Sequence, residues 1–79
     1  MNEQRVEVLE VVKRYTRTFL TVARERSFLK AAQKLRITQS AVSQKMSALE
    51  ASLGVKLFDR STRPLSFTTQ AKYLLQILQ

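Results

Sequence analysis

SFLKAAQKLRITQSAVSQKMSALEASL, residues 27–53, predicts two short helices joined by a tight turn. Ser27 suits the N-cap of the first helix, and Arg36-Ile37 interrupts its pattern. Its apolar residues recur at spacings of three and four and therefore share one side: Phe28, Ala31, Ala32 and Leu35. We therefore predict a helix-turn-helix at about residues 28–47.

The second helix carries two different faces. Thr38 is its predicted N-cap, and Gly54 ends it in the left-handed conformation. One narrow apolar stripe is formed by Val42, Met46, Leu49 and Leu53. Uncharged polar side chains fall within an arc of about 140° at 100° per residue, and they are Gln39, Ser40, Ser43, Gln44 and Ser47.

This polar face has two interpretations. The second helix of a helix-turn-helix can lie in a DNA major groove, where Gln can bond an adenine edge in two places and Ser can donate or accept. Ser and Gln can equally form an ordinary solvated face, so spacing alone decides nothing. The DNA interpretation requires the fold to leave this face open to a duplex.

Charge supplies context for that choice. The 79 residues contain 14 Lys and Arg against 6 Asp and Glu, a net charge of +8, and the pI is about 10.7. Residues 11–49 hold nine basic side chains and one acid, Glu25. Such a balance suits phosphate binding. A mixed-charge solvated surface and a membrane-bound basic helix are the alternatives, and the spread over several elements disfavours the membrane.

Composition also limits the function classes. Without His or Cys, and with scattered acids and no Gly-rich phosphate loop, the chain is a poor enzyme, and we predict no catalytic site, metal or cofactor. We expect neither a signal peptide nor a membrane span. Its length allows one domain with a small core, for which a partner subunit is expected.

The flanking segments complete the prediction. Residues 3–25 read as one helix with a stripe formed by Val8, Val12, Tyr15, Phe19 and Val22, widened by Leu9, Leu20 and Ala23. Alternating residues at about 57–67 predict a two-stranded wing. Arg63 is the first candidate in the wing, and Arg60 the second, for a side chain that enters a minor groove or contacts phosphates. Both could equally be ordinary loop arginines.

Thr68 is a predicted cap for a last helix over residues 69–79. Ala71, Leu74, Leu75 and Leu78 share one side, with Tyr73 and Ile77 beside them. A helix this apolar is expected to pair with a second copy or with helix 3–25. The pattern stops without a cap, as in a fragment of a larger protein.

Together these residues resemble the N-terminal winged helix-turn-helix domain of the LysR-type transcriptional regulators over about residues 11–79. The resemblance rests on Ala31-Ala32, Gln39, Ala41-Val42-Ser43, Leu49-Glu50, Leu53-Gly54 and Leu57-Phe58-x-Arg60. It implies a mainly α fold: a winged helix-turn-helix of three helices and a small two-stranded wing at 11–68, then a linker and dimerisation helix at 69–79. Residues 1–10 would extend the first helix.

The resemblance also implies roles. Thr38, Gln39, Ser40, Ser43, Gln44 and Ser47 would contact DNA from the recognition helix, and Arg60, Arg63, Lys30 and Lys45 would contact it from the wing or along the backbone. Tyr73, Leu74, Leu75, Ile77 and Leu78 would form the dimer. Three positions depart from the family: Gln44 stands where Arg is frequent, which favours adenine over guanine, Ser40 stands where Pro is frequent, and Gln70-Ala71 replaces Ala-Gly.

The implied partner is a double-stranded operator, an interrupted palindrome, bound by a homodimer through residues 69–79, with helix 1 as a further contact, in a bacterial cytoplasm at the nucleoid. The family's effector-binding domain is absent, so we expect no small-molecule effector site here, in either a fragment or a short natural relative. The alternative function is a winged-helix interaction module that dimerises with a full-length regulator without reading DNA.

Overall fold

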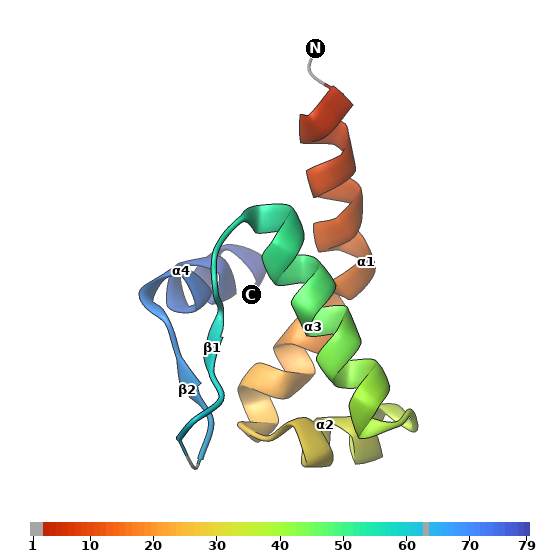
Figure 1. Cartoon of the computed structure of the whole chain (residues 1–79), viewed down its shortest axis with the longest axis vertical. Helices are drawn as coiled ribbons and strands as arrows, with labels where there is room; N and C mark the ends of the chain where they lie inside the picture. Colours follow the sequence, from red (N-terminus) through yellow and green to blue (C-terminus); the bar gives the residue numbers. More distant parts are fainter. Residues whose placement is uncertain (1–2, 63) are drawn as a thin grey trace.

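The computed structural model describes residues 3–62 and 64–79, and side chains from residue 9 onward. The elements follow in the order α1 (Glu3–Glu25), α2 (Phe28–Leu35), α3 (Gln39–Leu53), β1 (Phe58–Asp59), β2 (Ser66–Phe67) and α4 (Thr69–Leu78). Helix α1 packs against α2, α3 and α4, and the wing strands β1 and β2 lie beside α4 (Figure 1). The predicted winged helix-turn-helix is confirmed. Within the described residues, no helix is long and apolar enough to cross a membrane.

Helix ends follow the capping residues read from the sequence. The Ser27 hydroxyl accepts a hydrogen bond from the Lys30 N–H at 3.1 Å, and the Thr38 hydroxyl accepts one from the Ala41 N–H at 3.0 Å. Gly54 has φ +71°, the left-handed conformation predicted for it. Arg36 also adopts it, at φ +59°, and ends α2 with bonds to two of its carbonyls. The predicted caps at Ser27, Thr38 and Gly54 are confirmed.

The core lies where the three first helices meet the wing. Phe19 and Val22 of α1 are buried. Around them lie buried residues of all the other elements or their flanks: Ala31, Ala32, Val42, Met46, Leu49, Leu57, Phe58, Leu65 and Ala71. The Phe58 ring has its centroid 5.9 Å from that of Phe19 and 5.6 Å from that of Phe28. Phe58 therefore joins the wing to the helices.

The apolar stripe of α1 is buried only in part. Val12 and Tyr15 pack at the edge of the core, whereas Leu9, predicted to widen the apolar face, is 54% exposed. The prediction for Leu9 is wrong because the N-terminal half of α1 projects beyond the other helices, which leaves nothing there to cover it (Figure 1). The side chain of Val8 lies outside the described residues.

Each strand of the wing is two residues long. β1 and β2 are antiparallel, with Phe58 opposite Phe67 and Asp59 opposite Ser66. In the turn that follows β1, the Ser61 hydroxyl and backbone N–H both donate to the Asp59 carboxylate. These two hydrogen bonds lower the pKa of Asp59 below its ordinary value. The start of the turn is thus held by its own polar side chains. Arg63, predicted as the main DNA contact of the wing, lies outside the described residues.

Thr68 fastens the wing to α4. Its hydroxyl donates to the Lys56 carbonyl at 2.7 Å and accepts from the Ala71 N–H at 3.1 Å, and its backbone N–H donates to the Leu57 carbonyl at 3.0 Å. Thr68→Val keeps the side-chain shape but removes both hydroxyl bonds, so we expect it to lower the free energy of unfolding by about 1–2 kcal/mol. Urea denaturation measures the change. The exposed neighbour Thr69→Val is the control, and an equal effect of both would contradict the cap.

Candidate nucleic-acid interface

Helix α3 is held by its apolar stripe. Val42, Met46 and Leu49 are buried in the core, and α3 packs against both α1 and α2. At its N-terminal end Gln39, Ser40 and Gln44 are exposed, as is the capping residue Thr38. With Ser47, which is also exposed, five of the six predicted recognition-helix residues are accessible, and Ser43 is half-buried.

A hollow of about 410 Å³ lies at this end of α3. Three predicted site residues line it, namely Lys30 of α2, Gln39 of α3 and Arg60 of the wing segment, with Arg26 and Pro64 beside them. Its lining carries three cations, Arg26, Lys30 and Arg60, and one acid, Glu25. The tertiary structure thus brings the exposed Gln39 amide next to a basic surface.

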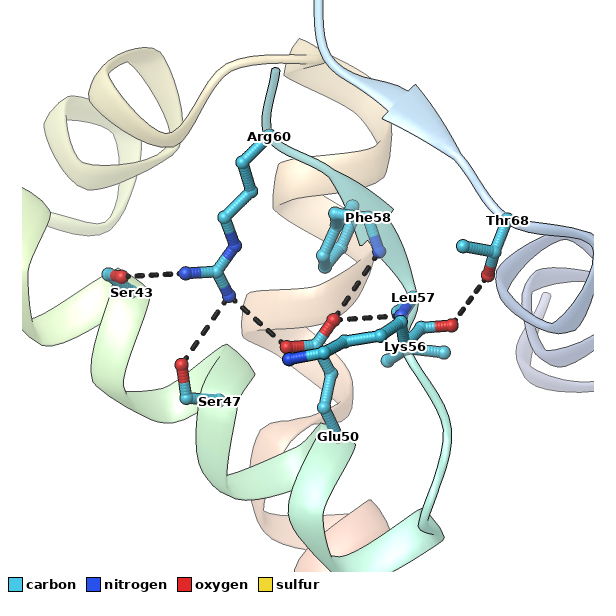
Figure 2. A network of polar contacts seen from close by, with 8 residues as sticks. All are labelled: Ser43, Ser47, Glu50, Lys56, Leu57, Phe58, Arg60 and Thr68. Carbon is cyan, nitrogen blue, oxygen red and sulfur yellow. Dashed lines mark hydrogen bonds and ion pairs between the residues drawn. The ribbon is translucent and has the colours of Figure 1, made fainter. Parts of the chain in front are cut away.

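Ser43 and Ser47 are not as free as predicted, because both are bound by Arg60, although Ser47 is exposed and Ser43 half-buried. The Arg60 guanidinium donates to the Ser43 hydroxyl at 3.2 Å and to the Ser47 hydroxyl at 3.4 Å (Figure 2). The expectation that the fold leaves this whole polar face free is wrong for these two residues. The reason is that the chain after α3 folds back along it and places a cation there.

Arg60 also differs from its predicted place as a free wing cation. One of its guanidinium nitrogens lies 3.2 Å from a carboxylate oxygen of Glu50, and its side chain is 40% exposed. The guanidinium carbon is 4.8 Å from the centroid of the Phe28 ring. A paired, stacked guanidinium holds a fixed position. Arg60 therefore connects the wing to α2 and α3.

Glu50 is the partner that sequence reasoning missed. Its side chain is 6% exposed, and one carboxylate oxygen accepts the Leu57 N–H at 2.8 Å and the Phe58 N–H at 3.4 Å while the other accepts Arg60 (Figure 2). A signal was available. Glu50 is the single acid in residues 26–58 and lies four residues after Met46, at the edge of the apolar stripe.

Lys45 lies apart from the other predicted contacts. It is half-buried, and its ammonium is 5.4 Å from the centroid of the Tyr15 ring of α1. This cation–π contact holds the Lys45 ammonium against α1. The prediction that groups Lys45 with Lys30 as a backbone contact is not supported by this position, since Lys30 lines the hollow and Lys45 does not.

The predicted dimerisation residues of α4 divide into two sets. Leu74, Leu75 and Leu78 pack against the chain's own core, in the arrangement with α1 that was one of the two expected. Tyr73 and Ile77 are 67% and 62% exposed. These two remain available to a second copy.

A helix-turn-helix with an exposed, uncharged N-terminal end on its second helix, closed by a two-stranded wing, defines a winged helix-turn-helix protein. The model of bacterial regulatory helix-turn-helix proteins of the lysR family matches residues 14–72. The chain therefore belongs to the lysR family, whose named relatives are transcriptional regulators.

Three curated relatives illustrate the similarity. The chain is 46% identical over 61 residues to a putative transcriptional regulator of Pseudomonas aeruginosa, covering 77% of this chain and 20% of that protein. It is 47% identical over 62 residues to the transcriptional activator AmpR of Yersinia enterocolitica, covering 78% and 21%. It is 40% identical over 63 residues to the regulator BenM of Acinetobacter baylyi, covering 80% and 21%. The chain thus spans about a fifth of the length of these relatives.

Solved structures of DNA complexes have a similar fold. The BenM DNA-binding domain in complex with benA site 1 DNA superposes with a TM-score of 0.79 at 38% identity, covering 82% of this chain and 73% of that one. DarR of Vibrio fischeri in complex with DNA gives 0.74 at 31% identity, covering 77% and 21%.

Proposed function

We propose that this chain binds double-stranded DNA in a sequence-specific manner, as the DNA-binding part of a LysR-type transcriptional regulator, with the N-terminal end of α3 in the major groove. The observation that carries the proposal is the position of Gln39, exposed at the start of α3 in a hollow it shares with Lys30 and Arg60. It is supported by the similarity to the BenM domain, whose structure is a DNA complex.

The exposed amides of Gln39 and Gln44 are the proposed base readers, each able to bond an adenine edge. Ser40 is small enough for close approach, and Thr38 lies where a phosphate could meet the start of the helix. Ser43 and Ser47 accept from Arg60, yet a hydroxyl keeps its own proton to donate. They can contact DNA as donors while Arg60 stays bound.

Backbone contacts come from two places. Lys30, exposed in the hollow, is the proposed phosphate contact of α2. Arg63 remains the proposed minor-groove contact of the wing. Arg60 is assigned a different part from the one the sequence indicated, because it positions the wing against α3 through Glu50. Its exposed edge can still meet a phosphate.

We propose that the protein acts as a dimer on an interrupted palindrome, in the bacterial cytoplasm at the nucleoid. Tyr73 and Ile77 offer exposed apolar surface on one helix, which suits a two-fold interface in which each copy presents the same residues. A pure interaction module would use that surface without preferring an operator to random duplex, and nothing in the interface favours that alternative.

The salt dependence of a gel shift tests the phosphate contact. Lys30→Gln is expected to weaken binding about equally on operator and mixed-sequence duplex and to reduce the slope of log K against log salt by about 1. The matched control is Lys34→Gln, which removes the same charge from α2 outside the hollow. Identical slopes for the two variants would contradict a Lys30 contact. Absence of any salt slope in the unaltered protein would overturn DNA binding itself.

A further inference from the structure

A second basic hollow, of about 610 Å³, lies between α1 and the C-terminal end of α2. Lys13, Arg17 and Arg24 of α1 and Lys34 of α2 line it, around the half-buried Leu20 and Leu35. We call this surface the α1 groove. The function proposed above does not use it.

The groove follows one face of α1. At 100° per residue, positions 13, 17, 20 and 24 fall within an arc of about 60°. Leu9, 54% exposed, lies on the same face one turn before Lys13. Beyond Leu20 and Arg24 a smaller hollow of about 150 Å³ continues the surface to Leu75 of α4. The result is a strip of cations with apolar residues along its floor and at its ends.

Among the described side chains, no ion pair within the chain neutralises the positive charge of the strip. In the described part of the chain, the one ion pair joins Arg60 to Glu50, so none of the four groove cations is paired there. Glu25 is the single acid that lines the groove. Like charges held close together repel, and a ligand carrying several negative charges relieves that repulsion while gaining attraction to each cation.

The apolar floor distinguishes between anionic ligands. A phosphate backbone offers little apolar surface to Leu20 and Leu35, whereas a helix with carboxylates on its flanks and Leu on its face matches both features. The groove is also separate from the 410 Å³ hollow that Lys30, Gln39 and Arg60 line, which we call the DNA-facing hollow because the proposed function places DNA there. Glu25 is the residue that lines both, and its charge opposes a phosphate chain that would run from one to the other.

We propose that the α1 groove is a docking surface for an acidic amphipathic helix of a partner protein, which can bind while α3 holds DNA. From Lys13 to Arg24 the groove spans about 17 Å at 1.5 Å per residue, which corresponds to a partner helix of about 12 residues. The cations fix the orientation of that helix, and Leu20 and Leu35 accept its apolar side chains.

The test uses the full chain and a fluorescein-labelled helical peptide of about 12 residues with Glu on its flanks and Leu on one face. Fluorescence anisotropy measures binding. Arg17→Glu and Arg24→Glu are each expected to weaken it by about tenfold or more. The matched control is Arg14→Glu, an exposed charge reversal on the same helix that lies outside the groove and is expected to have a much smaller effect. A peptide with Gln in place of Glu should bind poorly.

A mixed-sequence duplex added to the peptide complex separates this proposal from the DNA-binding one. Retention of the peptide on the DNA-bound protein supports a distinct groove, and its displacement overturns the proposal. Equal losses for Arg14→Glu and Arg17→Glu would also overturn it, because they would show a response to net charge alone. Sedimentation of the same variants measures self-association. A loss of dimer with Arg17→Glu would overturn the proposal, because it would show that a second copy of the chain occupies the groove. Circular dichroism verifies that each variant is folded.

Discussion

Glu50→Ala is expected to lower the free energy of unfolding by about 3 kcal/mol, a large part of the roughly 4–12 kcal/mol available to a domain of this size. The variant leaves the buried Leu57 and Phe58 N–H groups without the carboxylate oxygen that accepts them, and it removes the charge partner of Arg60. Buried donors that lose their acceptor cost more than the bond itself contributed.

Thermal and urea unfolding followed by circular dichroism measure this loss. Glu50→Gln keeps one acceptor oxygen and is expected to destabilise less than Glu50→Ala. Glu10→Ala, an exposed acid on α1, is the control and is expected to change stability little. Arg60→Ala should cost about 1 kcal/mol, since this partly exposed ion pair is screened by solvent. Equal stabilities of Glu50→Ala and Glu10→Ala would refute the anchoring role of Glu50.

Gln39→Ala is expected to reduce the preference for the operator over mixed-sequence DNA by about 1–3 kcal/mol, which corresponds to a factor of about 5 to 150. The amide lies exposed at the start of α3 in the hollow that Lys30 also lines, so truncation removes the proposed bidentate base contact without disturbing the core. Non-specific binding should change little, because the cations that would meet phosphates remain.

Competition gel shifts on both duplexes, at fixed salt, measure that preference. Gln33→Ala provides the matched control, since it removes the same exposed amide from α2, away from the DNA-facing hollow. An equal loss of affinity for operator and mixed-sequence duplex with Gln39→Ala would rule out base reading by this residue. Ser43→Ala is a poorer test, because it also removes an acceptor of Arg60.

Part of the candidate nucleic-acid interface could be predicted from the sequence because it depends on local interactions. The hydroxyls of Ser27 and Thr38 cap the helices that follow them, and Gly54 supplies the left-handed residue after α3. Capping joins residues three or four positions apart, so the local sequence is enough to predict it. The exposure of Gln39 does not follow from helical periodicity, since at 100° per residue Gln39 lies about 20° from the buried Met46. Gln39 is exposed at the first position of α3, at the end of the helix.

Other features could not be derived from local sequence, because they depend on contacts between elements. The burial of Glu50 is stabilised by backbone N–H groups seven and eight residues later, and Arg60 reaches back seventeen residues to Ser43. Lys45 meets Tyr15 across two helices, and Leu9 is left uncovered by the length of α1.

The sequence by itself therefore determined the helices, their ends and the candidate reading face, because hydrogen bonds and side-chain spacing within a few residues settle them. Only the tertiary structure decided which of the polar side chains stay free. A buried carboxylate must find donors wherever the fold brings them, and at Glu50 those donors are the start of the wing and Arg60, which in turn engages Ser43 and Ser47.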